Sequence, residues 1–91
     1  MAVRNNVERS RYELYVDDDL VGIADYRIDG DLVVFPHTEV RHDMQGRGFG
    51  AQLVQAALDD VRTEGRRVVP RCWYVAEFVE NHPEYTDLLA A

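Results

Sequence analysis

The chain has 91 residues, a length that fits one domain with one hydrophobic core. Apolar residues make up 46% and charged residues 30%, as in an ordinary globular protein. No apolar run approaches the roughly 20 residues that cross a bilayer, and none resembles a secretory leader. We therefore expect a cytoplasmic protein without membrane contact. The net charge of −7 argues against a general nucleic-acid binder, because such proteins cluster positive charge against phosphates.

The chain begins with a polar stretch and then a strand. Residues 1–10 show no apolar pattern, so we expect a flexible arm before a single domain at 11–91. From Tyr12 to Val16 apolar and polar residues alternate, which is the spacing of a half-buried strand. The acidic run at 17–19 predicts a turn.

A second strand is predicted over residues 21–28. Its apolar set changes phase by one residue between Ile23 and Ala24, which indicates a β-bulge. Asp29-Gly30 then predicts a hairpin with a two-residue type I′ turn.

The third strand, residues 32–40, is interrupted by Pro36, which cannot donate to a ladder and predicts a bulge or a loss of pairing. A helix is predicted over 51–64, with Gly65 as its stop. Its apolar positions follow helical spacing: Leu53, Val54, Ala57, Leu58 and Val61.

A further strand is predicted at 67–72, a short helix at 75–80 ended by Asn81-His82-Pro83, and then an apolar tail. The order βββ-α-β-α predicts an α+β domain with antiparallel N-terminal strands.

Charge and cysteine content narrow the chemistry. Residues 41–71 hold six arginines against four acids, while the remainder holds four against thirteen, so a locally basic site would sit in an acidic body. All ten basic residues are arginine. The single cysteine, Cys72, excludes an internal disulfide, and the scattered histidines His37, His42 and His82 predict no metal site.

A glycine-rich turn carries the strongest functional signal: Gln45, Gly46, Arg47, Gly48, Phe49 and Gly50. A strand that enters a helix through such a turn points unpaired backbone N–H groups and the positive end of the helix dipole at one place, so an anion is expected there. The alternative is that the glycines only tighten the turn.

Other phosphate motifs fit this turn less well. A P-loop requires a lysine, which the chain lacks. The spacing of Gly46, Gly48 and Ala51 matches the dinucleotide fingerprint, but the next strand ends in Arg71-Cys72 where that site needs an acid.

The spacing of Gln45, Gly48 and Gly50 resembles the acetyl-CoA motif of the GNAT superfamily of N-acetyltransferases, with Val40 at the apolar position five residues upstream. Together with 37–40, 69–72 and 83–85, it makes the whole chain similar to the short GNAT-like family. The resemblance implies a mixed sheet that opens between the strands ending near Val40 and Cys72 to admit acetyl-CoA.

The same resemblance implies residue roles. Backbone from Gly46 to Ala51, with the Gln45 amide and the Arg47 charge, would hold the CoA pyrophosphate, and Thr38 to Val40 would pair with pantetheine. Glu39 or His37, two apart on one strand face, could take a proton from an amine; the alternatives are an exposed Glu39 and a His37 that caps the proline break.

Cys72 beside Arg71 could accept the acetyl group as a thiolate, or it could be a buried core residue. Trp73, Tyr74 and Phe78 are expected in the core or in the cleft wall. In the last motif of larger family members the asparagine position is Trp73 here, the general-acid tyrosine position is Glu80, and the final Gly-Phe is Glu84-Tyr85.

We therefore expect an acetyl-CoA-dependent N-acetyltransferase whose acidic body favours a cationic amine acceptor. A CoA-binding module without turnover is the second hypothesis, and an interaction domain that binds no CoA is the third.

Overall fold

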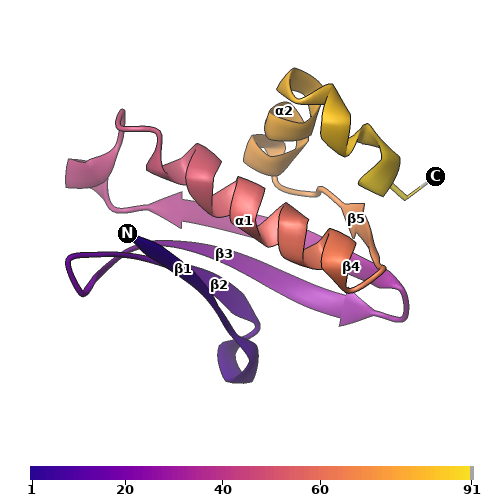
Figure 1. Ribbon diagram of the computed structural model, residues 1–91, viewed down its shortest axis with the longest axis horizontal. Helices are drawn as coiled ribbons and strands as arrows, with labels where there is room; N and C mark the ends of the chain where they lie inside the picture. Colours follow the sequence, from indigo (N-terminus) through magenta and orange to yellow (C-terminus); the bar gives the residue numbers. More distant parts are fainter. Residues whose placement is uncertain (91) are drawn as a thin grey trace.

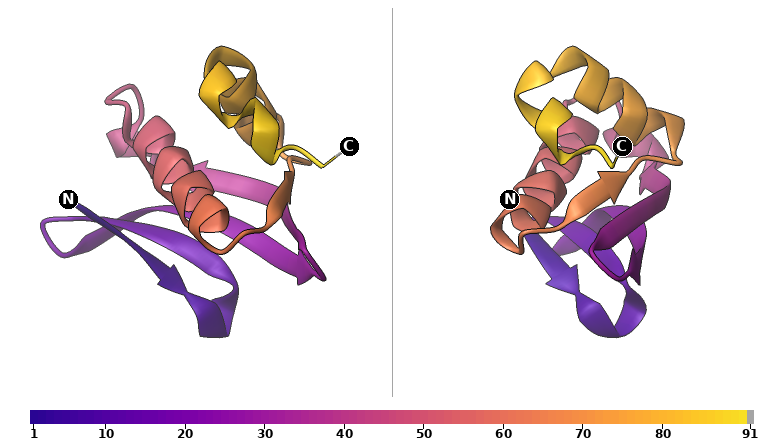
Figure 2. Two further views of the ribbon diagram at one scale, coloured as in Figure 1. Left: turned by 45° about the vertical axis from the view of Figure 1, so that its right-hand side comes forward. Right: turned by 90° about the vertical axis from the view of Figure 1, so that its right-hand side faces the viewer.

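The computed structural model describes residues 1–90 as a five-stranded sheet in the order β1-β2-β3-β4-β5. The elements are β1 (Ala2–Asn6), β2 (Arg11–Val16), β3 (Asp19–Asp29), β4 (Leu32–Val40), α1 (Phe49–Thr63), β5 (Arg67–Val69) and α2 (Trp73–Asn81). Both helices lie over one face of the sheet, with α2 beside β5 (Figures 1 and 2). The predicted α+β class and the antiparallel N-terminal strands are confirmed.

The expected flexible arm is wrong. Residues Ala2–Asn6 pair antiparallel with β2, and Val7–Arg9 form a short 3-10 helix. Strand pairing needs only backbone N–H and C=O groups, so a polar segment without apolar alternation can occupy the edge of a sheet.

Two bulges interrupt the sheet. Val21 has no partner between the pairs Tyr15–Leu20 and Leu14–Gly22, which confirms a bulge in β3, slightly earlier than the phase change predicts. In β4, Phe35 and Pro36 together oppose the single residue Tyr26, so the bulge expected at Pro36 is also confirmed.

The hairpin turns differ from expectation in one detail. Asp29 pairs directly with Leu32, so the β3–β4 turn is Gly30-Asp31, and of these two residues Gly30 has the positive φ of 60°, as in a type II′ turn. The type I′ geometry occurs at the first hairpin, where Asp17 and Asp18 both have positive φ.

The core lies between the sheet and the helices. The apolar stripe predicted for α1 is buried as expected, at Leu53, Val54, Ala57, Leu58 and Val61. Each fully buried leucine or valine contributes about 1.5–3 kcal/mol to folding. The helix begins at Phe49, before the expected 51, and α2 begins at Trp73.

The C-terminal part is more helical than expected. The strand predicted over 67–72 ends at Val69, and the apolar tail forms a 3-10 helix at Pro83–Leu88. Parallel pairing of β4 with β5 covers only Leu32–Val34 and Arg67–Val69. Beyond β5 the Cys72 N–H still bonds to the Phe35 carbonyl oxygen, and β4 then continues to Val40 while the chain enters α2, so the end of β4 has no parallel neighbour among the described residues.

The opposite face of the sheet carries a charged cluster. The Glu13 carboxylate is 2% exposed and accepts hydrogen bonds from Arg11 Nε (2.7 Å), Tyr15 Oη (2.9 Å) and Asn6 Nδ2 (3.1 Å). Burial alone would raise the pKa of Glu13, but these bonds outweigh it and hold the pKa below its ordinary value. Among residues 1–90 no helix is long and apolar enough to cross a membrane.

Candidate functional site

The glycine-rich turn is held against the end of β4. Gln45 Nε2 donates to the carbonyl oxygen of Val40 at 3.1 Å, so the side chain predicted to meet an anion uses one of its two N–H bonds to position the turn. Gly46 and Gly48 have φ of 80° and 78°, a conformation that L side chains rarely adopt. These two glycines therefore set the path of the backbone into α1.

The N-terminus of α1 is open. Gly48 is the N-cap residue and supplies no side chain, and the first helical hydrogen bond runs from Gln52 N to Gly48 O at 3.1 Å. The N–H groups of Phe49, Gly50 and Ala51 precede that bond and have no helical acceptor. The dipole of a 15-residue helix adds partial positive charge at the same place.

A pocket of about 460 Å³ adjoins this helix end. It is bounded by the end of β4, the glycine-rich turn, the start of α1 and the start of α2. Its lining residues are Thr38, Glu39, Val40, Met44, Gln45, Gly46, Gly48, Phe49, Gly50, Trp73 and Tyr74. The structure thus brings most of the predicted binding residues together, while His37, Arg47, Ala51 and Cys72 lie outside the lining.

Tyr74 packs directly against the helix end. An ideal Cβ built on Gly50 would lie 2.8 Å from Tyr74 Cζ and still closer to the hydroxyl oxygen. Close packing rather than φ therefore favours glycine at position 50, and it lets the Tyr74 ring pack against the start of α1. Burial raises the pKa of Tyr74, with Glu77 adding to the shift, so this phenol stays protonated at neutral pH.

Thr38 lines the pocket and carries an unsatisfied hydroxyl. Its Oγ1 is buried and has no hydrogen-bond partner among residues 1–90. A buried hydroxyl without a partner costs free energy, so a ligand group that bonds to it would bind more tightly.

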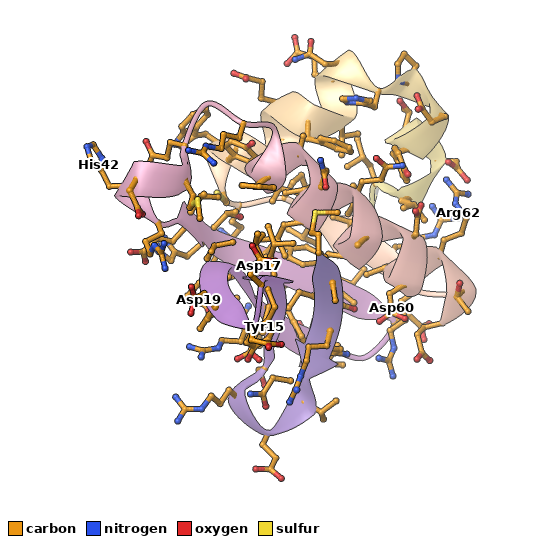
Figure 3. All side chains as sticks on the ribbon, turned by 60° about the vertical axis from the view of Figure 1, so that its left-hand side comes forward. Tyr15, Asp17, Asp19, His42, Asp60 and Arg62 are labelled. Atoms are coloured by element: carbon orange, nitrogen blue, oxygen red, sulfur yellow. The ribbon has the colours of Figure 1, made fainter. Side chains whose placement is uncertain are left out.

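The two candidate bases contact each other. His37 Nε2 lies 3.1 Å from Glu39 Oε2, and both side chains are largely exposed. Their common strand face is confirmed, but only Glu39 also lines the pocket. His42, the histidine of the short 3-10 helix His42–Met44, projects away from the body (Figure 3).

Cys72 lies at the N-cap of α2 and is half-buried against the hydrophobic core. Its backbone N–H donates to the Phe35 carbonyl oxygen at 2.8 Å, and its own carbonyl accepts from Ala76 N at 3.1 Å. The bond to Phe35 holds the start of α2 against the bulged part of β4, and the bond from Ala76 closes the first turn of α2. Cys72 is a free cysteine that is partly buried against the core cluster.

Of the two arginines near the turn, Arg41 is paired with an acid and Arg47 is not paired with one among residues 1–90. Arg41 forms a two-point ion pair with Asp43, at 2.7 and 3.0 Å, which holds the pKa of Asp43 below its ordinary value. Arg47 makes no ion pair within the described part of the chain and is exposed, so its charge is available beside the turn.

Sequence reasoning missed part of the pocket wall. Met44 was not expected there. The sequence did not separate core from cleft wall for the three aromatic residues near the start of α2; in the structure Trp73 and Tyr74 line the pocket and Phe78 is in the core.

Comparison with protein families supports this description. A family model described as GCN5-related N-acetyltransferase matches residues 11–88. Protein NATD1 of Bos taurus is 42% identical over 52 residues, covering 57% of this chain and 46% of its own, so that match spans about half of the relative. Protein NATD1 of Danio rerio is 28% identical over 92 residues, covering 96% and 83%.

Solved structures share the fold. The solution structure of a GCN5-like protein from Staphylococcus aureus superposes with a TM-score of 0.76 at 17% identity, covering 99% of this chain and 88% of that one. The ribosomal-protein-S18-alanine N-acetyltransferase from Escherichia coli gives a TM-score of 0.65 at 20% identity, covering 72% and 44%.

Proposed function

This chain belongs to the GCN5-related N-acetyltransferase family, and we propose that it binds acetyl-CoA in the pocket at the N-terminus of α1 and transfers the acetyl group to an amine. The observation that carries the proposal is the pocket itself. An open helix N-terminus and two positive-φ glycines form one end of it, and the diverging end of β4 forms its wall.

The pyrophosphate of CoA would bind at the glycine-rich turn. The N–H groups from Gly46 to Ala51 offer several donors to an anion, and glycine lets a phosphate approach the backbone closely. The exposed Arg47 guanidinium, just outside the pocket lining, would attract the negatively charged pyrophosphate. The Gln45 amide, held by Val40, would keep the turn in register.

The pantetheine arm would follow β4. The Phe35 and Val40 carbonyl oxygens already accept bonds from Cys72 and Gln45, but between them this strand has no β5 partner within the described residues, so its other backbone groups can pair with the amides of the arm. The buried Thr38 Oγ1 could serve as an additional partner for one of those amides. Thr38 and Val40 are therefore proposed as contacts of the arm.

In the transfer step, the neutral nitrogen of an amine attacks the thioester carbonyl. A C–N bond forms, the C–S bond breaks, and the amine proton passes to the Glu39 carboxylate, which becomes neutral and can pass the proton to His37 Nε2. The CoA thiolate takes a proton from a donor in the pocket, and that donor regains a proton from solvent as Glu39 or His37 releases its own. The Tyr74 hydroxyl is the group we assign to that donation, in place of the tyrosine that Glu80 replaces.

A route through Cys72 is the alternative for the same activity. Its thiolate would attack the thioester, form a new C–S bond and release CoA, and an amine would then take the acetyl group from the cysteine. Arg71 would favour the thiolate form. Because the thiol packs against the core outside the pocket lining, this route requires the start of α2 to move.

A CoA-binding module without turnover is the second candidate function. Glu80, at the position of the usual acid, is exposed on α2, and Trp73 stands where larger members carry an asparagine. If Tyr74 cannot donate a proton to the thiolate, binding without transfer would follow.

The binding test compares two glycines. Gly48 and Gly30 both have positive φ, at 78° and 60°, and both have open space where a Cβ would be. Gly48→Glu and Gly30→Glu therefore introduce the same charge and similar strain, at the pocket and at a remote hairpin respectively. Calorimetry with CoA should show a loss of at least about 100-fold in affinity for Gly48→Glu and no more than about twofold for Gly30→Glu. Equal losses would contradict the pocket assignment.

The transfer test is intact-protein mass spectrometry and thiol release with acetyl-CoA and a panel of amines. Acetylated amine without acetyl-protein indicates direct transfer. An acetyl group on the protein that hydroxylamine removes, and that Cys72→Ser abolishes, indicates the cysteine route. CoA binding without either product supports the module.

A further inference from the structure

Trp73 forms the rim of the pocket. It is the single tryptophan of the chain, and it is 71% exposed even though it lines the pocket beside Tyr74. The two rings meet edge to face, with centroids 5.7 Å apart. The exposed face of the indole is therefore free to meet a bound molecule.

Two exposed carboxylates lie at this rim, and Arg71, two residues before Trp73, is exposed as well. Glu39 is the one charged residue in the pocket lining within residues 1–90, and its side chain is 66% exposed. On α2, Glu77 follows Trp73 by one turn, so the two side chains share a helix face, and Glu77 is exposed. An exposed indole next to carboxylates is a chemistry that binds cations.

The pocket thus has two ends of opposite character. The glycine-rich end offers backbone N–H groups to an anion, and the Trp73 end offers a π face and carboxylates. A cosubstrate that fills the first end leaves the second for the acceptor. The net charge of −7 supports the approach of a positively charged molecule.

We propose that Trp73 is a specificity-determining residue that binds a positively charged group of the amine acceptor, distinct from the nitrogen that is acetylated. This inference rests on the proposed acetyl transfer. An ammonium held by the Trp73 indole and the Glu77 carboxylate is stabilised in its protonated form and has no lone pair for attack, which leaves Glu39 as the base for the other nitrogen. The acceptor class is therefore an amine with a second cationic group nearby, either a free diamine or a lysine side chain beside another basic residue.

The first experiment uses Trp73 as its own reporter. With CoA bound, 1,5-diaminopentane and n-pentylamine are titrated while tryptophan fluorescence is recorded, since every change in the signal arises from Trp73. We expect a saturable change at a diamine concentration about tenfold below that needed for the monoamine, the size of one cation–π contact. If calorimetry shows that the diamine is saturating and the tryptophan fluorescence is still unchanged, the inference is overturned.

The second experiment measures transfer. Wild type should prefer the diamine over the monoamine by about tenfold in kcat/KM. Trp73→Leu should reduce that preference to about twofold or less, and Trp73→Phe should retain part of it. Ile28→Ala, which trims another exposed apolar side chain far from the pocket lining, is the matched control and should keep the preference.

A second arm separates the two sources of the cation. A peptide with a lysine next to an arginine is compared with the same peptide carrying alanine in place of the arginine. A preference among the peptides but not the small amines assigns the site to a protein acceptor, and the reverse assigns it to a free diamine.

The failures are distinguishable. If no amine is acetylated, the proposed function fails, and the fluorescence titration still decides whether Trp73 binds a cation. If amines are acetylated but Trp73→Leu keeps the full diamine preference, the function stands and the specificity role is wrong.

Discussion

The two ends of α1 are built in opposite ways. At the C-terminal end side chains are paired: Tyr12 Oη donates to Asp60 Oδ2 at 2.6 Å, Tyr85 Oη donates to Asp59 Oδ1 at 2.7 Å, and Arg62 forms a two-point ion pair with Asp87. At the N-terminal end the cap is a glycine without a side chain, and the first N–H groups are open. Figure 3 shows Asp60 and Arg62 on the paired half of the helix.

This difference separates stability from binding. The paired end ties α1 to the sheet through Tyr12 and to the C-terminal 3-10 helix through Tyr85 and Arg62. The open end can then leave backbone groups unsatisfied for a ligand, because the helix does not depend on them for its position. Changes at one end should affect folding, and changes at the other should affect CoA affinity.

High pH should disrupt the paired end most. Burial and the hydrogen bond to Asp59 raise the pKa of Tyr85 to about 12, and burial with Asp60 raises the pKa of Tyr12 above its ordinary value. The unfolded phenols lose protons near pH 10. The contribution of these phenols to stability is therefore complete below about pH 10 and is lost as the pH rises from there through the folded pKa.

The measurement is the free energy of unfolding by urea at about pH 8, 10 and 11, with tyrosinate absorbance recorded in parallel. In Tyr12→Phe/Tyr85→Phe the decline above about pH 10 should be much shallower. An equal decline in wild type and double variant would contradict this account.

Tyr12→Phe at neutral pH is the next largest effect. Tyr12 is 6% exposed, and the substitution removes the hydroxyl that donates to the charged Asp60 carboxylate. The carboxylate is then left without that donor. We expect a loss of about 2 kcal/mol in the free energy of unfolding, with CoA affinity of the folded protein unchanged. Tyr26→Phe, which removes the bond from Tyr26 Oη to Asn5 Oδ1, should cost less because that acceptor is neutral.

Gly50→Ala tests the open end. The new Cβ would collide with Tyr74, so the ring must move within the pocket. We expect CoA affinity to fall by about tenfold, while the melting temperature changes little because alanine also favours the helix. Gly50→Ala/Tyr74→Ala should recover binding relative to Gly50→Ala. No recovery would indicate that Gly50 acts through its backbone rather than through space for Tyr74.

Arg62→Ala should give the smallest effect. The guanidinium bonds to Asp87 and to the Glu84 carbonyl oxygen, but both partners of the ion pair are exposed. An exposed pair of this kind contributes little to the free energy of unfolding, and the loss should shrink further at high salt. A large, salt-independent loss would show that this contact is not a surface interaction.

Local sequence determined the elements whose signal lies within one segment. The apolar spacing from Leu53 to Val61 specified α1 and its buried face, Pro36 specified the bulge in β4 because it lacks an N–H, and the glycine spacing from Gly46 to Gly50 specified the turn and the family. These features follow from backbone conformation and periodicity, which depend on neighbouring residues alone.

Tertiary structure decided what depends on partners distant in the chain. Ala2–Asn6 became a strand because β2 offers a free edge, Tyr74 packs against the start of α1 because Gly50 has no side chain, and Asp59 and Asp60 accept hydrogen bonds from two different tyrosines. Cys72 packed against the core and Trp73, its neighbour, remained exposed at the pocket. Which of two adjacent side chains is buried depends on how α2 packs against β4, a contact between segments that no local pattern encodes.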